Sequence, residues 1–179
     1  MTRTRSIKLA AAAAALSTAA LPTAVSAQEC VAQSDVADTV VFAVPIAVKT
    51  LRTKCGETLS LGGFLMSGSD TMVAAFEQEG TAAWPGALRL ISTFAGKDGG
   101  ADAIAESLAT LDAENAGNLL GALLPGMVLK DFDVKDCGKI ERGLELLAPL
   151  PPENLGGIAA FIAEMSKVKN PSICPDDAA

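Results

Sequence analysis

The sequence predicts an all-α fold: a compact, disulfide-braced bundle of about six to eight short helices that follows an N-terminal signal peptide. Three observations support this prediction. Apolar residues recur at helical spacing in several segments. Glycines, prolines and capping residues separate these segments. Four cysteines occur in a chain that begins with an export signal, and an even number of cysteines in an exported protein indicates disulfides.

The first 27 residues have the three parts of a cleavable export signal. A basic start at 3–8 precedes an uncharged stretch that is most apolar over 9–21, and Val25-Ser26-Ala27 supplies the small residues that a signal peptidase reads. The apolar core is shorter than the ~20 residues that cross a bilayer as a helix, which disfavours a retained anchor. We therefore expect cleavage after Ala27 and one helical domain over 28–179, in the periplasm or outside the cell.

The first expected helical region covers residues 34–54. Within it, Thr39–Val48 is mostly β-branched or aromatic, which favours a strand. Against a strand stand the helical spacing of Val40, Val44 and Val48 and the presence of Pro45, which a central strand does not tolerate. We interpret the region as two short helices with a bend near Val44-Pro45.

Capping residues and breakers delimit the next two helices. Ser69 or Asp70 can cap a helix that Gly80 ends. Pro85 suits the first turn of another helix, which stops at Gly96. Each of these helices carries several large apolar residues that need a core.

Two further helices are expected between residues 102 and 126. The first carries an apolar stripe formed by Ile104, Leu108 and Leu111. Asp112 can cap the second, which closes at Pro125-Gly126. Ala116–Leu129 is uncharged and about fourteen residues long, which suits a buried core segment rather than a membrane span.

Two apolar stripes predict the last two helices, and both stripes are expected to face the core. Asp136 can cap the first helix, whose stripe consists of Ile140, Leu144 and Leu147. The second follows a proline-rich turn, and its stripe consists of Leu155, Ile158, Ile162 and Met165. The opposite side of this second helix carries Glu153, Glu164 and Lys167.

Composition limits the chemistry that the chain can perform. The signal removes three of the 14 lysines and arginines and none of the 21 acids, so the mature net charge is 11 − 21 = −10. This charge argues against binding to nucleic acid or anionic lipid. The chain has no histidine, which excludes Ser-His-Asp and Cys-His hydrolases and histidine-ligated metals. The local basic group of Lys49, Arg52 and Lys54 suits a helix C-terminus and needs no ligand.

The four cysteines are expected to form two disulfides rather than a zinc site, since no two of them have the close spacing of zinc ligands. Cys137 begins one expected helix and Cys174 follows the next, so an antiparallel hairpin brings these two together. That pairing leaves Cys30 with Cys55, which requires a sharp bend near Pro45. If the segment between Cys30 and Cys55 is a straight helix, the disulfides must instead cross between the two halves of the chain.

The candidate catalytic and metal motifs are all weak. Asp131–Asp136 fails the calcium-loop pattern, because Asp136 stands where glycine is needed and Arg142 stands where a bidentate glutamate belongs. Ser166 and Lys169 have the spacing of a Ser-Lys acylase without its buried setting. Close acid pairs resemble the carboxylates of glycosidases only in spacing. These pairs are Asp35 and Asp38, Glu77 and Glu79, and Glu141 and Glu145. The aromatic residues are most simply core: Phe42, Phe64, Phe76, Trp84, Phe94, Phe132 and Phe161.

We therefore expect no catalytic residue, cofactor or metal ligand, and a non-enzymatic binding or structural module of the cell envelope. One alternative is a carrier or sensor of a small apolar ligand in a cavity between helices. The other is a carboxylate- or Ser-Lys-based enzyme, which is disfavoured. A cavity of more than a few hundred Å³ favours the carrier, an exposed apolar patch favours a protein partner, and two buried acids in a cleft favour the enzyme.

Overall fold

The computed structural model describes residues 30–98, 102–128, 132–169 and 171–175, so the expected signal peptide lies outside the described residues. The described residues are helical apart from connections and two isolated β-bridges, which confirms the all-α class. Their elements are α1 (Gln33–Cys55), the π-helical turn η1 (Phe64–Gly68), α2 (Asp70–Asp98), α3 (Asp102–Ala109), α4 (Ala113–Val128), the 3-10 turn η2 (Val134–Asp136), α5 (Cys137–Leu147) and α6 (Pro152–Met165).

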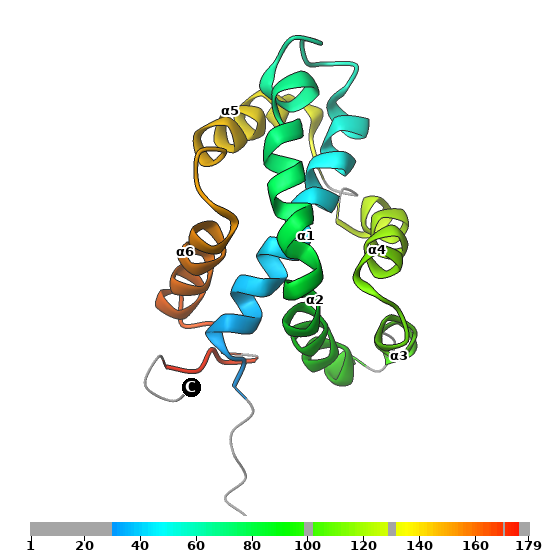
Figure 1. Ribbon diagram of the computed structural model, residues 1–179, viewed down its shortest axis with the longest axis vertical. Coiled ribbons are helices and arrows are strands. Elements are labelled where there is room, and N and C mark those ends of the chain that lie inside the picture. The colour runs from blue at the N-terminus through cyan, green and yellow to red at the C-terminus, as the bar shows by residue number, and fades with distance from the viewer. Residues whose placement is uncertain (1–29, 99–101, 129–131, 170, 176–179) are drawn as a thin grey trace, which may run out of the picture.

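Helices α1 and α2 pack together along the centre of the molecule. In Figure 1, α5 and α6 lie on one side of this pair and α3 and α4 lie on the other. The main core forms where α1 and α2 meet α4 and α6, and a smaller cluster surrounds Cys55 and Cys137. The main core includes Phe42, Ile46, Met72, Phe76, Trp84, Leu108 and Leu155. Burial of these side chains is the main favourable term for folding.

Helix α1 is one continuous helix of 23 residues with Pro45 inside it. Residues Thr39–Val48 are thus helical, but the expected break into two helices is wrong. Proline inside a helix costs about 3 kcal/mol. Continuity keeps Phe42, Ile46 and Val48 buried in the core, and the burial of each large apolar side chain contributes about 1.5–3 kcal/mol. Packing therefore outweighs the local preference.

The breakers in α2 and α4 also fail to end their helices. Helix α2 passes through Gly80 and Pro85, where two helices were expected, and α4 passes through Pro125. Pro85 is exposed. The ring therefore points to solvent, where water can satisfy the helix carbonyl that lacks a donor.

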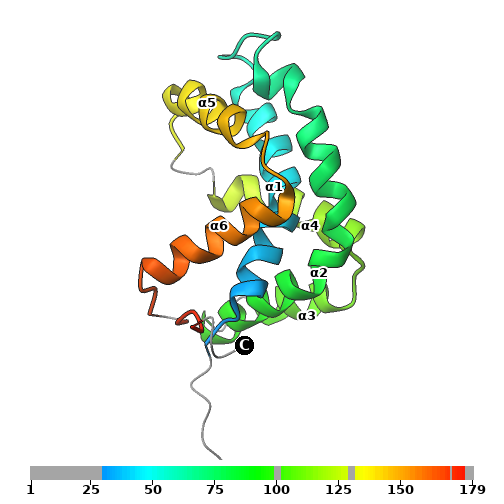
Figure 2. The ribbon, with the colours of Figure 1, turned by 60° about the vertical axis from the view of Figure 1, so that its left-hand side comes forward.

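The two disulfides do not follow the preferred pairing. Cys30 is bonded to Cys174, and Cys55 to Cys137, so both bridges cross between the halves of the chain. The preferred pairs Cys137–Cys174 and Cys30–Cys55 are wrong because α1 is unbroken. At 1.5 Å per residue its 23 residues rise about 34 Å, far beyond the ~7 Å limit for bridged Cα atoms. The first bridge joins the two ends of the described chain, which lie close together in Figure 2. Val31 also pairs with Ile173 at this point.

Helix α6 is oriented differently from the expectation. It contacts α1 through small residues: a Cβ added to Gly156 would lie 2.8 Å from the carbonyl oxygen of Ala37, so the two backbones are in close contact. Leu155 is buried, but Ile158, Ile162 and Met165 are exposed. The expectation that all four residues of this stripe face the core is therefore wrong for three of them.

The other two stripes differ in outcome. In the stripe of α3, Leu108 is fully buried and Ile104 and Leu111 pack against the core, as expected. In the stripe of α5, Leu144 packs against the core while Leu147 is exposed.

Candidate functional site: a groove between α1, α2 and α4

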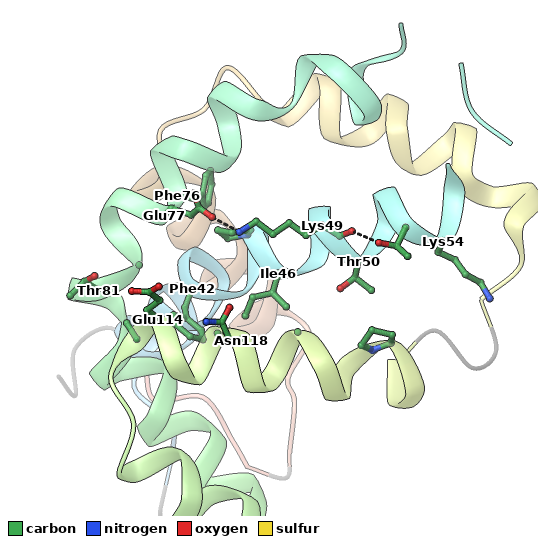
Figure 3. Close-up of a pocket in the computed structure, with 17 residues that line it drawn as sticks. Phe42, Ile46, Lys49, Thr50, Lys54, Phe76, Glu77, Thr81, Glu114 and Asn118 are labelled. Atoms are coloured by element: carbon green, nitrogen blue, oxygen red, sulfur yellow. Dashed lines mark hydrogen bonds and ion pairs between the residues drawn. The ribbon is translucent and has the colours of Figure 1, made fainter. Parts of the chain in front are cut away.

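An open groove of about 1010 Å³ runs between α2 and α4, with α1 as its floor (Figure 3). Phe42, Pro45 and Ile46 of α1 and Phe76 of α2 supply its apolar lining, and all four are buried. Phe42, Ile46 and Phe76 belong to the main core, so the floor of the groove is preformed.

Two glycines of α4 keep the groove open. Gly117 and Gly121 are one helical turn apart and both line the groove. A Cβ on Gly121 would lie 3.8 Å from Cγ2 of Ile46, and a Cβ on Gly117 would lie 3.9 Å from Cζ of Phe42. Both distances are ordinary contacts, so the space above the two positions is empty because neither residue has a side chain. The spacing of the two glycines is visible in the sequence, but only the packing of α4 shows that it leaves a groove.

The rim of the groove is polar and carries both charges. Nζ of Lys49 in α1 donates a hydrogen bond to Oε1 of Glu77 in α2, across one edge of the groove. Both side chains are about half exposed, so this pair contributes little to stability. At one end of the groove lies Lys54, which forms no salt bridge with any described residue, and at the other lies Glu114 near Thr81 (Figure 3).

A single tryptophan reports on the floor of the groove. The ring centroids of Phe42 and Trp84 are 4.8 Å apart, and Nε1 of Trp84 donates a hydrogen bond to the carbonyl oxygen of Leu111 at 3.1 Å. Trp84 is buried directly behind Phe42. Because the chain has one tryptophan and no tyrosine, its intrinsic fluorescence comes almost entirely from this position.

The acid pair Asp35 and Asp38 joins α1 to α2 and does not line the groove. Both oxygens of Asp35 accept hydrogen bonds from Arg89, at 2.6–3.2 Å. Burial raises the pKa of Asp38, and the negative charge of Asp35 raises it further, while Arg89 opposes the shift. A Cβ on Gly86 would collide with the Asp38 carboxylate, so this contact is tight. Asp35 therefore joins the two helices through Arg89, and the tight contact at Asp38 leaves no room for a substrate.

The other acid pairs have structural partners as well. Glu77 pairs with Lys49, and Glu145 pairs with Arg142 at 2.7 Å. Oε1 of Glu141 accepts a hydrogen bond from the backbone N–H of Leu65 in η1, at 2.9 Å. Neither Glu77 with Glu79 nor Glu141 with Glu145 forms an isolated pair of facing carboxylates.

The Ser-Lys pair and the acidic run also have structural roles. The hydroxyl of Ser166 donates to the carbonyl of Ile162, one turn back, and Lys169 is exposed. Asp133 caps η2 by accepting from the N–H of Lys135. Asp131 lies outside the described residues. Within the described ranges, no group of three or more cysteines or acids is placed to hold a metal ion.

The basic group Lys49, Arg52 and Lys54 divides into separate roles. Arg52 donates to the carbonyl of Leu65, to Oγ of Ser69 and to Oδ1 of Asp70, so it holds the turn between α1 and α2. Only Lys49 and Lys54 reach the groove. Arg52 thus has a structural role and needs no ligand, as expected for the basic group. The two lysines differ, because a ligand in the groove can reach them.

The described residues form a disulfide-braced, all-helical fold with a preformed amphipathic groove between α1, α2 and α4. Comparison of the chain with protein-family models, with curated protein sequences and with solved structures gives no match. Among the described residues, no individual helix has the length and apolar character to span a membrane. Val134–Leu147 and Pro152–Met165 meet the criteria only as a pair, bent by 117°.

Proposed function

We propose that this protein is an exported, non-enzymatic binding module that holds an amphipathic helix of a protein partner in the groove between α1, α2 and α4. The observation that carries the proposal is the groove itself: a preformed floor that is apolar at Phe42, Pro45 and Ile46, between two helical walls and with a polar rim. An amphipathic helix in a hydrophobic groove is a recurring mode of peptide recognition.

The length of the groove suits a short helix. Its lining residues on α1 run from Phe42 to Lys54, which corresponds to a rise of about 18 Å. A helix of about three turns covers that distance and presents apolar residues at positions i, i+3, i+4 and i+7 to the floor. The open upper side leaves room for its polar face.

The charges at the ends of the groove give such a helix a direction. A lysine end and a glutamate end attract opposite charges, and electrostatic complementarity of this kind mainly sets orientation and specificity. The absence of histidine and the structural roles of the acid pairs support a non-enzymatic role. Two disulfides fit the oxidising environment of an exported protein. The mature charge of −10 argues against a nucleic acid as the partner.

Titration of the mature chain with a designed peptide tests the proposal. The probe is a helical peptide of about 14 residues with leucines on one face, glutamate at its N-terminal end and lysine at its C-terminal end. The protein used in this assay carries Ile162→Asp. This substitution places a charge on the exposed apolar face of α6, so that this face does not compete with the peptide. A bound peptide covers Phe42, whose ring centroid lies 4.8 Å from that of Trp84, and removes water from the surroundings of this aromatic pair, so we expect a saturable change in the fluorescence of Trp84.

Two glycine substitutions provide the matched pair for this experiment. Gly121→Leu fills the groove and should weaken peptide binding at least tenfold. Gly138→Leu places the same side chain in open space on α5, so it should leave binding unchanged. Saturable binding that Gly121→Leu does not weaken would show that the groove is not the site.

The volume of the groove favours a second candidate, a carrier of a small amphipathic molecule, because drug-sized ligands occupy about 300–1000 Å³. Lys54 is placed to pair with the head group of an anionic ligand. Dodecanoate is a suitable probe in the same fluorescence assay. Binding of dodecanoate with a micromolar Kd, lost in Gly121→Leu, together with failure of the peptide to bind, would favour the carrier over the helix-binding module.

A further inference from the structure

The most unusual surface of the described chain is the outer face of α6. Four large apolar side chains on this face are 44–65% exposed, namely Ile158, Phe161, Ile162 and Met165. They follow the spacing i, i+3, i+4 and i+7, so they form one continuous stripe, defined here as the α6 stripe. Large apolar side chains that gather on one exposed face indicate a surface that is covered in the working molecule.

The inner face of α6 shows why the stripe points outward. This face consists mainly of small residues, with Gly156 in direct contact with the backbone of α1. A helix that buried its large residues against α1 would have to sit farther away and give up that close contact. The stripe is therefore built into the chain as an outward surface.

We infer that the helix held in the groove is α6 of a second copy of this chain, so that the α6 stripe of one copy occupies the α1–α2–α4 groove of the next. This inference rests on the proposed function and names the partner. The chain thus carries both halves of one interface, a convex apolar helix and a concave apolar groove, on separate helices.

The dimensions of the two surfaces agree. Helix α6 rises about 20 Å from Pro152 to Met165, while the groove extends about 18 Å along α1. The stripe covers about 10 Å in the C-terminal half of α6. With the N-terminus of α6 at the Lys54 end, this half lies over the apolar floor at Phe42 and Ile46, which is at the Glu114 end of the groove (Figure 3). A groove covers the stripe from three sides, whereas two convex α6 helices would touch only along a line. The groove of another copy is thus the better cover than a second α6 helix.

The order of charges agrees as well. Helix α6 has Glu153 in its first turn and Lys167 and Lys169 after its end, and the groove has Lys54 at one end and Glu114 at the other. Opposite charges meet only if the N-terminus of α6 lies at the Lys54 end. Glu153 lies on the side of α6 away from the stripe, and Lys167 follows the end of the helix, so these charges set direction more than affinity. They oppose the general repulsion between two acidic chains.

This contact is heterologous, because different surfaces of the two copies meet. Such contacts lead to chains or closed rings of copies rather than to a symmetric pair. Until a ring closes, the copy at one end of such a chain retains a free groove and the copy at the other end retains a free α6 stripe. The assembly can therefore extend beyond two copies.

A mixing experiment tests the inference on the mature disulfide-bonded chain, with molar mass measured by light scattering at concentrations up to about 100 µM, where a micromolar contact is saturated. We expect the unsubstituted chain and Gly138→Leu to form oligomers whose mass rises with concentration. Ile162→Asp lacks the stripe and Gly121→Leu lacks the groove, so each alone should be a monomer. An equimolar mixture of these two variants should form dimers and nothing larger, since only one intact stripe meets one intact groove.

Three results would overturn the inference. The first is a monomeric unsubstituted chain, and the second is a Gly121→Leu variant that still associates, which would place the stripe against another surface. The third is a mixture that stays monomeric although circular dichroism shows both variants to be folded. If Ile162→Asp folds poorly, Ile162→Ala replaces it as a milder change. This variant should weaken association at least fivefold. In all three cases the Ile162→Asp protein can still bind the designed peptide. The two experiments therefore distinguish a failure of self-assembly from a failure of the groove as a binding site.

Discussion

The orientation of α6 can be tested directly by comparing two alanine substitutions on that helix. Leu155 and Ile162 belong to the same apolar stripe of the sequence, and a helix with that stripe in the core would bury both. In the structure Leu155 is 9% exposed and Ile162 is 57% exposed. Leu155→Ala and Ile162→Ala therefore remove similar side chains from very different environments.

The expected costs follow from these exposures. Replacing a buried leucine by alanine costs about 2–5 kcal/mol, because the apolar contact is lost and a cavity remains. At Ile162 less than half of the side chain is removed from water and no enclosed cavity forms, so the cost should be at most about 1 kcal/mol. The two variants should thus differ by at least about 1–2 kcal/mol in the free energy of unfolding.

Urea unfolding followed by circular dichroism measures this difference, with the disulfides intact and the protein at low micromolar concentration. Low concentration keeps self-association from contributing to the stability of Ile162 variants. Equal costs for the two substitutions, both above 2 kcal/mol, would refute the outward orientation of the stripe. The inferred self-assembly would then lose its surface.

Other predictions concern the bridges and contacts that position α1. Replacing Cys55 and Cys137 together by alanine opens a loop of 82 residues and should cost about 4 kcal/mol, seen as a lower urea midpoint. Because the pKa of Asp38 is raised in the folded state, the contribution of Asp38 to stability falls as the pH rises above the ordinary value of 3.8. Asp38→Asn should therefore melt at a higher temperature than the wild type at pH 7 and at the same temperature at pH 3. Gly156→Ala should destabilise the fold by about 1–2 kcal/mol through its clash with α1, whereas Gly157→Ala, which meets open space, should stabilise it by up to about 1 kcal/mol.

Each of these predictions has an outcome that contradicts it. An unchanged urea midpoint after loss of the Cys55–Cys137 bridge would mean that the bridge does not constrain the unfolded chain. A lower melting temperature of Asp38→Asn at pH 7 would show that the charged carboxylate stabilises the fold through Arg89. Equal stabilisation by Gly156→Ala and Gly157→Ala would place α6 farther from α1 than the structure has it.

The expected signal peptide at residues 1–27, the single domain after it and the export of the chain remain predictions. Edman sequencing or mass spectrometry of the exported protein tests the cleavage site after Ala27. A mature protein that begins at Gln28 supports that site. A retained N-terminus would contradict it.

Local patterns in the sequence were sufficient for the class of the fold. Apolar residues once per turn give a helix a face to bury, and this periodicity does not depend on what the helix packs against. This periodicity predicted the helical class, and the even number of cysteines predicted two disulfides. The glycine pair Gly117 and Gly121 was also visible in the sequence, but its meaning depends on which surface α4 meets.

Tertiary packing decided the rest, because it depends on contacts between residues far apart in the chain. Pro45 and Pro85 did not end their helices, since burial along a continuous face outweighed the local cost of proline. The unbroken α1 in turn forced the cysteines to pair across the two halves of the chain. The sequence showed that α6 has a large apolar side and a small-residue side, but both can be buried. Close packing against α1 buries the side of α6 with small residues. The large side chains therefore face outward, where a partner can reach them.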